Sequence, residues 1–286
     1  MHILITGGQG YIGSYLTKAF LELGHAVTTL DTGFNAKPTL DLGKYNGKLV
    51  RHQASIANPD AVGRALQGVD VIYHLAARSD WEASPRHPLR LIETNVQGTA
   101  TVFAMARKAG VDKVIFTSDV AVYGNLVGAK PTDPCMPVNM YGASKLAAEA
   151  VCRGFYQLGM EIVILRLASV YGHPGSCSVV NKFVAGYNII YGDGDQTRDF
   201  IFIDDAIKAL VSSHLWDANI YNIATGEEVS INGLWHILRP VEEPTYVASV
   251  VDEVFRFCGN IDDTPWRPER LLSNLTGGAI RQYCLE

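Results

Sequence analysis

An apolar stretch followed by three regularly spaced glycines opens the chain and limits what it can fold into. Residues 3–5 are Ile-Leu-Ile, Gly7, Gly10 and Gly13 come next, and apolar residues then recur at helical spacing over residues 12–23. In a strand–turn–helix of this kind the first glycine makes the tight turn. The second lets the backbone approach a pyrophosphate, and the third lets the helix pack against its strand. The helix N-terminus also offers N–H groups to an anion. The segment therefore predicts a dinucleotide-binding α/β unit.

An acidic residue, Asp31, ends the second predicted strand at residues 26–31. In dinucleotide-binding folds a carboxylate at this place accepts hydrogen bonds from the adenosine ribose hydroxyls, and its charge repels the 2′-phosphate of NADP. We therefore expect NAD as the cofactor. The alternative is a glycine-rich turn with no ligand, which the strand, the helix and Asp31 together disfavour.

The composition is that of an ordinary globular protein, with 48% hydrophobic and 19% charged residues among 286. A formal net charge of −5 gives no sign of a surface for nucleic acid or membrane. The chain begins directly in a predicted strand, and no apolar run reaches the ~18 residues that a membrane span needs. We therefore expect a cytoplasmic protein with no signal peptide, no membrane partner and no nucleic-acid partner.

The cysteines are scattered along the chain, at Cys135, Cys152, Cys177, Cys258 and Cys284. Their odd number and the expected compartment favour free thiols. They show no CxxC or CxxxC spacing and no paired spacing with the histidines, so we expect no metal site.

Predicted strands and helices alternate through the first two thirds of the chain. Strands are expected near residues 2–6, 26–31, 48–52, 70–75, 113–118 and 162–165, and helices over 11–23, 58–67, 88–109 and 139–159. Alternation of this kind predicts a Rossmann-like doubly wound parallel sheet with helices on both faces. Glycines in the left-handed conformation are expected just after four of the helices, at Gly24, Gly68, Gly110 and Gly159.

The alternating pattern breaks after Leu167, where loops rich in Gly, Pro and Asp separate short segments. We expect residues 1–166 to form the NAD-binding Rossmann domain, which also carries the catalytic helix. Residues 167–286 are expected to form mainly a smaller, discontinuous α/β substrate-binding cap, with segments able to exchange with the main sheet.

Two polar residues, Tyr141 and Lys145, lie four residues apart on the helix predicted over residues 139–159. This spacing places them on one helix face within reach of each other. A tyrosine with a pKa near 10 is a poor base at neutral pH, but an adjacent ammonium and an oxidised nicotinamide favour its phenolate. The phenolate could then take a proton from a substrate hydroxyl. A solvated Tyr/Lys pair is the alternative, which the upstream glycine loop disfavours.

Together these residues resemble an extended short-chain dehydrogenase/reductase of the nucleotide-sugar (NAD-dependent) epimerase/dehydratase family. The resemblance covers residues 2 to about 235. It rests on Thr-Gly-Gly-Gln-Gly-Tyr-Ile-Gly (6–13), His-Leu-Ala-Ala (74–77), Asn-Val-Gln-Gly-Thr (95–99), Val-Tyr-Gly (122–124 and 170–172), Tyr-Gly-Ala-Ser-Lys (141–145), Gly-Asp-Gly-Asp-Gln-Thr-Arg-Asp-Phe (192–200) and Tyr-Asn-Ile-Ala-Thr-Gly (221–226).

The resemblance implies a set of NAD-binding residues. They are Gly7, Gly10, Tyr11, Ile12, Gly13, Asp31, Ser55, Ile56, Leu75, Ala76, Ala77, Asn95, Tyr141 and Lys145. Ser55-Ile56 stands where an Asp usually contacts the adenine amino group, and Ser55 can still accept a hydrogen bond. Asn95 either bridges the strands or a water, or is a buried structural amide.

The family pattern also places a catalytic Ser or Thr four residues before the Val-Tyr-Gly tyrosine. Here that residue is Asp119, with Ser118 just before it. Strand alternation points the two side chains to opposite sides, so Ser118 substitutes only if the backbone is shifted. Asp119 therefore either accepts the sugar hydroxyl itself or, as an anion near Tyr141, opposes its activation.

On the substrate side, Arg198 matches the family position that holds the sugar-nucleotide diphosphate, a task that suits a bidentate guanidinium. The alternative for Arg198 is an ion pair with Asp199 or Asp195. Four further residues are substrate-binding candidates, of which two, Val180 and Tyr191, could equally be core residues of the cap: Ser79, Ser169, Val180 and Tyr191. A second diphosphate arginine has no clear counterpart, and the candidates are Arg256 and Arg267.

The residues before Val-Tyr-Gly also bear on the reaction. A 4,6-dehydratase commonly has an Asp-Glu pair there, whereas this chain has Val120 and Ala121, which cannot transfer protons. We therefore expect a nucleotide-sugar epimerase, acting most simply at C4 through a transient 4-keto intermediate. The alternatives are a 4-keto-sugar reductase, the 4,6-dehydratase, and a non-catalytic NAD(P)-binding sensor or RNA-binding module. The resemblance further implies a homodimer formed through the helices at 88–109 and 139–159.

Overall fold

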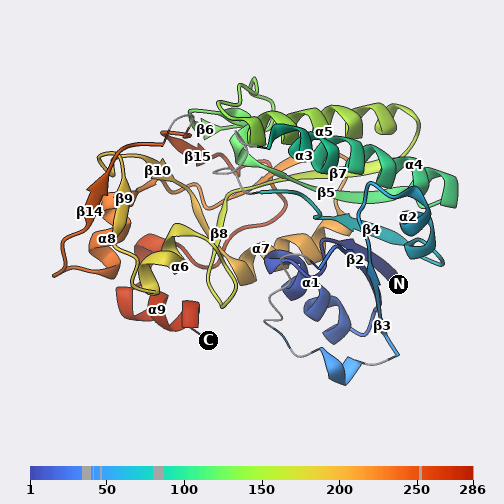
Figure 1. The fold of residues 1–286 in the computed structure, drawn as a ribbon, viewed down its shortest axis with the longest axis horizontal. Helices are drawn as coiled ribbons and strands as arrows, with labels where there is room; N and C mark the ends of the chain where they lie inside the picture. The colour runs from blue at the N-terminus through green and yellow to red at the C-terminus, as the bar shows by residue number, and fades with distance from the viewer. Residues whose placement is uncertain (34–39, 41, 46, 80–86, 251–252, 286) are drawn as a thin grey trace. The chain divides into compact units, whose positions relative to one another are not determined.

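The structure, a computed structural model, describes the chain apart from residues 34–39, 41, 46, 80–86, 251–252 and 286. Within that part, a seven-stranded sheet has the strand order β12-β7-β5-β4-β1-β2-β3 (Figure 1). Within this order, the adjacent pairs β5–β4, β4–β1, β1–β2 and β2–β3 are parallel. Helices flank this sheet, so the doubly wound α/β class predicted from the alternating pattern is confirmed.

The elements that the sequence predicted agree closely with the predicted ranges, whereas the strand at 220–223 and the helix at 203–212 had no predicted counterpart. The strands of the sheet are β1 (His2–Thr6), β2 (Ala26–Asp31), β3 (Leu49–Gln53), β4 (Val71–His74), β5 (Lys113–Asp119), β7 (Glu161–Leu167) and β12 (Ile220–Ile223). The helices that lie between strands of this sheet in the chain include α1 (Tyr11–Glu22), α2 (Pro59–Ala65), α3 (Pro88–Ile92), α4 (Thr99–Ala109), α5 (Met140–Gln157) and α7 (Ile203–Ser212).

The remaining strands form four two-stranded sheets, which pair β6 with β15, β8 with β11, β9 with β14, and β10 with β13. Their bounds are β6 (Leu126–Ala129), β8 (Ser169–Tyr171), β9 (Ile189–Tyr191), β10 (Thr197–Arg198), β11 (Phe200–Phe202), β13 (Val229–Ser230), β14 (Thr245–Val247) and β15 (Phe257–Gly259). The helices among them are α6 (Val179–Val184), α8 (Ile231–Leu238) and α9 (Gly277–Leu285).

The strand order reverses direction at β1. The chain moves outward from β1 through β2 to β3 on one side, and β4 and β5 follow on the other side. Such a reversal is the place where doubly wound sheets bind ligands, just beyond the carboxyl ends of the strands. The last residues of β1 and β4 are Thr6 and His74, and they therefore mark the edge of the sheet where a ligand is expected to bind.

Helix ends follow the expected chemistry, and one helix contains an irregular turn. Gly24, Gly68, Gly110 and Gly159 all have positive φ values, between 69° and 94°, as predicted. The helix predicted over residues 88–109 contains a π-helical segment, η2 (Glu93–Gly98), between α3 and α4. Such widened turns occur frequently at functional sites.

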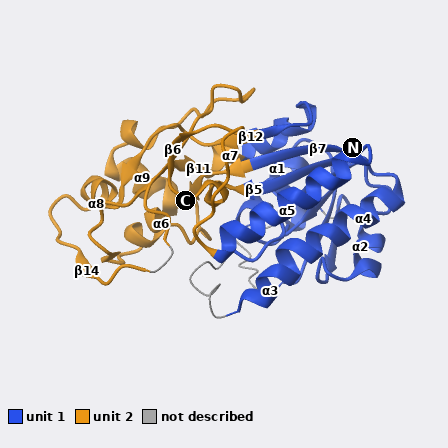
Figure 2. Ribbon diagram, turned by 90° about the horizontal axis from the view of Figure 1, so that it is seen from above, with its two compact units in different colours: residues 1–118, 140–165, 207–220 blue, residues 119–139, 166–206, 221–286 orange. Residues whose placement is uncertain are grey.

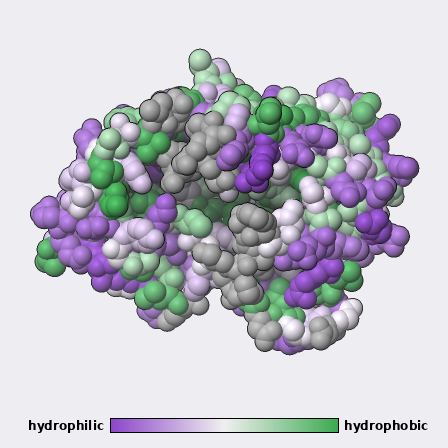
Figure 3. All heavy atoms as spheres, viewed as in Figure 1, coloured by the Kyte–Doolittle hydropathy of each residue, from purple (hydrophilic) through white to green (hydrophobic). Residues whose placement is uncertain are grey.

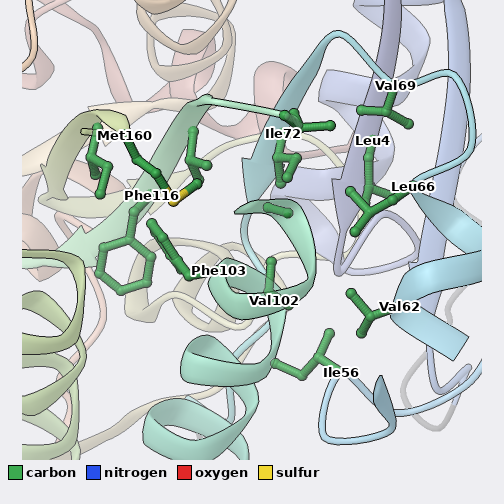
Figure 4. Close-up of a cluster of buried hydrophobic side chains, with 14 of the residues drawn as sticks. Leu4, Ile56, Val62, Leu66, Val69, Ile72, Val102, Phe103, Phe116 and Met160 are labelled. Carbon is green, nitrogen blue, oxygen red and sulfur yellow. The ribbon is translucent and has the colours of Figure 1, made fainter. Parts of the chain in front are cut away.

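A hydrophobic core lies between the sheet and helices α2, α4 and α5. Leu4, Ile72 and Phe116 project from the strands toward the helices, where Val62 and Phe103 meet them (Figure 4). All five side chains are at most 1% exposed. This packing fixes β1, β4 and β5 against the three helices.

The chain divides into two compact units (Figure 2). The first unit contains residues 1–118, 140–165 and 207–220, and the second contains 119–139, 166–206 and 221–286. Segments from either side of residue 166 thus contribute to each unit.

On the face in view in Figure 3, hydrophilic residues cover most of the described surface, with hydrophobic residues in small groups among them. Among the residues that the structure describes, no helix combines the length and the apolar character that crossing a bilayer requires.

Candidate active site

The glycine loop joins β1 to α1 in the first unit. Gly7 has a φ of +72°, and a Cβ there would lie 2.8 Å from the Ala76 nitrogen. A Cβ on Gly13 would collide with the Gly7 carbonyl oxygen. The loop, the first turn of α1 and the segment after β4 can therefore approach each other only because Gly7 and Gly13 lack side chains. This close fit supports the roles predicted for the two glycines.

The N-terminus of α1 has the features of an anion-binding site. Gly10 is the N-cap, and no side chain of the described residues forms a cap hydrogen bond there. The first turn of α1 also carries no acidic residue. The helix therefore directs backbone N–H groups and the positive end of its dipole toward the loop. A pyrophosphate fits this donor set.

Asp31 lies next to the same loop, at the carboxyl end of β2. Its Oδ2 accepts a hydrogen bond from the Gln9 nitrogen at 3.0 Å, and its Oδ1 accepts one from the Gly33 nitrogen at 2.9 Å. An ionised carboxylate has about four acceptor positions, so both oxygens can still accept a ribose hydroxyl. The structure thus brings Asp31 to the glycine loop, as the prediction of an NAD site requires.

The segment after β4 carries three of the predicted cofactor residues. The Leu75 nitrogen donates to the Thr6 carbonyl at 3.1 Å, and the Ala76 nitrogen donates to Thr6 Oγ1 at 3.2 Å. Both bonds tie this segment to the end of β1. Leu75, Ala76 and Ala77 remain partly exposed, which leaves them available to a ligand.

The two predicted adenine-side residues differ in accessibility. Ser55 is exposed, and its hydroxyl accepts a hydrogen bond from the Ala57 nitrogen at 3.1 Å. Ile56 is 4% exposed and belongs to the hydrophobic core. Ser55 is therefore the better placed of the two for a polar contact with a ligand.

A buried line of hydrogen bonds runs from the end of β1 to the π-helical segment. Thr6 Oγ1 lies 2.6 Å from His74 Nδ1, and His74 Nε2 lies 2.9 Å from Thr99 Oγ1. Thr99 donates its own proton to the Asn95 carbonyl at 2.6 Å, so it must accept from His74. His74 therefore carries its proton on Nε2 and accepts from Thr6 on Nδ1.

His74 is neutral in this line of bonds. Burial, and after it the charge of Lys145, lower the pKa of His74 to about 3. Because neutral imidazole has one donor and one acceptor, both nitrogens are satisfied by the two threonines. His74 thus connects two elements of the fold without a buried charge.

Asn95 connects the segment after β4 to α5. Its side-chain oxygen accepts from the Arg78 nitrogen at 2.8 Å, and its Nδ2 lies 3.0 Å from the Arg78 carbonyl and 2.9 Å from Ser144 Oγ. Ser144 in turn donates to the Tyr141 carbonyl at 2.7 Å. The buried amide thus bridges a predicted cofactor-binding segment to the first turn of the helix that carries Tyr141.

Lys145 lies at the carboxyl end of β5 and is 3% exposed. Its Nζ donates to the Thr117 carbonyl at 2.6 Å and lies 4.6 Å from the centre of the Phe116 ring. These two contacts fix the ammonium at the end of β5. Lys145 itself lies on α5, four residues after Tyr141. This position is consistent with the predicted pairing of the two side chains.

Ser118 and Asp119, the two candidates to replace the family's catalytic Ser or Thr, have different hydrogen-bond partners. Ser118 Oγ donates to Glu149 Oε1 at 2.6 Å, and both side chains are buried. The Asp119 carboxylate instead accepts from the Ala121 nitrogen at 2.8 Å and caps the short helix η3 (Val120–Tyr123). The Ser118 hydroxyl is therefore already bonded to α5. Asp119 is thus the stronger candidate to replace the catalytic Ser or Thr.

Sequence reasoning missed Glu149. It follows Lys145 by four residues on α5 and is fully buried. A carboxylate at that helical spacing after Lys145 could have been noticed in the sequence. Its partner, Ser118, could not, because the hydrogen bond joins residues 31 positions apart.

In the second unit, Arg198 pairs with Glu253, which sequence reasoning did not identify. Arg198 Nη2 lies 2.5 Å from Glu253 Oε1. Asp199, one of the partners considered for Arg198, instead accepts hydrogen bonds from Thr225 and from the Gly226 nitrogen. Burial raises the pKa of Asp199, and these hydrogen bonds oppose that shift. Asp199 thus holds two segments of the unit together beside Arg198.

The other predicted substrate residues fall into different environments. Val180 is fully buried in α6 and belongs to the core of the second unit. Tyr191 is 43% exposed at the end of β9, and its carbonyl accepts from Gln196. Ser169 is half-buried at the start of β8, and Ser79 in the first unit is exposed. Tyr191 and Ser79 are therefore the more accessible candidates.

The two further arginines have protein partners. Arg256 forms two hydrogen bonds with Glu228, each 2.7 Å long. Arg267 donates to the backbone carbonyls of Asp262, Thr264 and Trp266. Both arginines are exposed, and 54% of the Arg256 side chain is accessible.

A hollow of about 580 Å³ lies in the first unit, away from the glycine loop of that unit. Lys113, Glu161 and Trp216 help to line it. Lys113 and Glu161 begin β5 and β7, so the hollow lies at the amino ends of the strands. The glycine loop follows the carboxyl end of β1. Among the residues described, no group of three or more His, Cys, Asp or Glu side chains is arranged to hold a metal ion.

Residues 3–224 match the family model described as the NAD-dependent epimerase/dehydratase family, and the chain belongs to that family. The chain is 34% identical over 252 residues to a UDP-glucose 4-epimerase from Mycolicibacterium smegmatis, covering 82% of this chain and 80% of that protein. It is 30% identical over 278 residues to a UDP-N-acetyl-alpha-D-glucosaminuronate decarboxylase from Bacillus cytotoxicus, covering 88% and 82%.

A solved dTDP-glucose 4,6-dehydratase from Streptomyces venezuelae, with NAD bound, is similar over 99% of this chain and 97% of that chain. The TM-score is 0.87 and the sequence identity is 26%. These relatives carry the names of three different reactions, so the choice of reaction for this chain depends on its own site residues.

The neutral state of His74 predicts a pH-dependent stability. An unfolded histidine titrates near pH 6.5, whereas His74 in the folded chain has a pKa of about 3. The unfolded state therefore binds more protons between these values, and stability falls as the pH drops below 6.5. At pH 5 the expected loss from this residue is about 2 kcal/mol relative to pH 8.

The measurement is urea denaturation at pH 8 and pH 5 of the wild type and of His74→Asn. Asparagine keeps one donor and one acceptor but does not titrate, so the variant should lose about 2 kcal/mol less than the wild type between the two pH values. Equal losses in the two proteins would show that folding does not lower the pKa of His74.

Proposed function

We propose that this chain is an NAD-dependent nucleotide-sugar epimerase that acts at C4 through a transient 4-keto intermediate. The observation that carries the proposal is the buried Lys145 on the same face of α5 as Tyr141. This helix is joined through Ser144 and Asn95 to the segment that follows β4. The family and the relatives support nucleotide-sugar chemistry in general. The epimerase reaction is inferred from the residues.

The first unit supplies the residues that would hold NAD. The glycine loop and the N-terminus of α1 suit the pyrophosphate, and Asp31 suits the adenosine ribose. Leu75, Ala76 and Ala77 would lie along the dinucleotide. Bound there, NAD supplies a reversible two-electron acceptor for the sugar carbinol.

Tyr141 Oη would take the proton of the reacting sugar hydroxyl and later return it. Lys145 would favour the phenolate form of Tyr141 by its positive charge. The Thr117 carbonyl holds the ammonium in place, so its position costs little reorganisation during the reaction. Val120 and Ala121 provide neither acid nor base, which disfavours the loss of water that a 4,6-dehydratase requires.

Asp119 departs most from the family pattern. An ionised carboxylate can only accept hydrogen bonds, whereas a Ser or Thr hydroxyl can also donate one. Asp119 would therefore bind the sugar in its hydroxyl form, before oxidation. The capping bond from the Ala121 nitrogen fixes the orientation of the Asp119 carboxylate.

A direct test is a panel of UDP-, dTDP-, GDP- and CDP-sugars incubated with the purified protein and NAD, with anomeric NMR signals as the readout. We expect a pair of C4 epimers to interconvert. Release of carbon dioxide from UDP-glucuronic acid, or a stable 4-keto product, would replace the epimerase with another enzyme of the family. No turnover despite NAD binding would favour the sensor class.

The role of Asp31 predicts cofactor selectivity. NAD should bind at least tenfold more tightly than NADP, a difference of about 1.4 kcal/mol, because Asp31 accepts ribose hydroxyls and repels a 2′-phosphate. Calorimetric titration of both cofactors into cofactor-free protein measures the difference. Asp31→Asn removes the charge and should reduce the difference between the NAD and NADP affinities. Equal affinities for the two cofactors in the wild type would contradict the role of Asp31.

The two possible effects of Asp119 predict opposite results. If Asp119 accepts the reacting hydroxyl, Asp119→Ala should lower turnover by about 10² or more while NAD affinity stays the same. If Asp119 only opposes the activation of Tyr141, Asp119→Ser should raise turnover and move the rising limb of the pH profile to lower pH.

Steady-state kinetics over a range of pH values separate the two effects, with Tyr141→Phe as the inactive control. Unchanged rates and pH profiles in both Asp119 variants would exclude both roles for this residue.

We also propose a homodimer through the exposed faces of α4 and α5. The two helices pack against each other, and Ala104, Ala150 and Gly154 on them are small and exposed. Small residues of this kind let a second pair of helices approach closely. Sedimentation at micromolar concentration should give twice the mass of the chain, and Gly154→Arg should give a monomer. A monomeric wild type would refute the dimer.

A further inference from the structure

The Arg198 guanidinium is already engaged by a carboxylate of its own unit. Arg198 Nη2 lies 2.5 Å from Glu253 Oε1, and Nη1 donates to the Thr197 carbonyl at 2.7 Å. The Arg198 and Glu253 side chains are only 20% and 21% exposed. An ion pair with so little contact with water interacts strongly, unlike a fully exposed surface pair.

The backbone on either side of this pair is fixed. The Thr197 nitrogen donates to the Phe255 carbonyl at 2.8 Å. The side chain of Asn125 accepts from the Phe255 nitrogen at 2.6 Å and from the Arg256 nitrogen at 3.2 Å. These bonds hold the segment that follows Glu253 against β10. Glu253 is therefore placed beside Arg198 by the fold of the second unit.

We propose that Glu253 competes with the diphosphate of the nucleotide sugar for the Arg198 guanidinium. Binding would then exchange one anion for another on the same cation. This inference rests on the proposed function, because it takes Arg198 as the residue that holds the diphosphate. Carboxylate and phosphate oxygens both match the geometry of the guanidinium donors, so either anion can satisfy them.

The exchange would favour ligands with high negative charge. A displaced Glu253 loses its cation while it remains partly buried, which is unfavourable for a carboxylate. Burial also raises the pKa of Glu253, and Arg198 opposes that shift. A diphosphate carries more charge than a monophosphate and offers more acceptor oxygens to offset this loss. The cost of displacing Glu253 therefore lowers the affinity for a diphosphate, whereas a monophosphate that does not displace Glu253 is affected less.

The test uses the whole chain and UDP as the probe. Glu253→Gln keeps the size of the side chain but removes its charge, so the variant should bind UDP about tenfold more tightly in calorimetric titrations. The affinity for UMP should change less. Without ligand, the variant should unfold at a lower temperature than the wild type, because Arg198 has lost its anion, and UDP should raise that temperature more than in the wild type.

Two further variants complete the test: one is a matched control for the loss of a carboxylate, and the other replaces Glu253→Gln if that variant does not fold. Glu242→Gln removes a carboxylate that pairs with Arg239 at 2.9 Å in the same unit, and it should leave UDP binding unchanged. Where Glu253→Gln does not fold, Glu253→Asp shortens the side chain and loosens the pair. It should then tighten UDP binding about threefold.

Arg198→Gln distinguishes failure of this inference from failure of the proposed function. If Arg198→Gln weakens UDP binding while Glu253→Gln leaves it unchanged or weakens it, the competition is refuted and Arg198 keeps its role. If Arg198→Gln leaves UDP binding unchanged, the assignment of the diphosphate to Arg198 is refuted as well. In the double variant the gain from Glu253→Gln should disappear, because the shared cation is gone.

Discussion

The close fit of α1 against the glycine loop is the contact on which the rest of the first unit depends. A side chain on Gly13 would collide with the Gly7 carbonyl, and one on Gly7 would press against the Ala76 nitrogen. Three chain segments can therefore meet at the carboxyl ends of β1 and β4. The Gln9 nitrogen then holds Asp31 at the same place. The donors and the acceptor expected of an NAD site are thus assembled by backbone geometry before any ligand binds.

Neutral groups extend this arrangement to the catalytic helix. His74 carries no charge and bonds two buried threonines, and Asn95 continues the connection to Ser144 on α5. The Thr117 carbonyl holds the Lys145 ammonium, which in the proposed mechanism supplies the positive charge for Tyr141. A neutral His74 next to the Lys145 ammonium avoids the repulsion that two buried cations would produce. In the proposed mechanism, the charge that would favour the Tyr141 phenolate is therefore concentrated on Lys145.

Local sequence patterns predicted the parts of this structure that depend on local chemistry. The strand–glycine–helix spacing predicted the loop, and the glycines after four helices have the expected positive φ values. The four-residue spacing of Tyr141 and Lys145 predicted that they share a helix. Asp31 was placed correctly because it ends the strand adjacent to the loop.

Contacts between distant segments were not predictable in the same way. Ser118 meets Glu149 across 31 residues and Arg198 meets Glu253 across 55, and no local pattern records either distance. The π-helical turn at Asn95 was also missed, because the apolar spacing of residues 88–109 is that of one continuous helix. These tertiary contacts determine which hydrogen-bond and ion-pair partners Ser118 and Arg198 have, and therefore which ligand contacts the two side chains can make.

The central claim is that the sugar is oxidised at C4 and then reduced again at the same carbon within one active site. The most direct measurement uses UDP-glucose deuterated at C4, with the C4 epimer followed by NMR and mass spectrometry. We expect the epimerised product to keep its deuterium at C4, with no net change in NAD. A product that has exchanged the C4 deuterium for solvent hydrogen would contradict this claim.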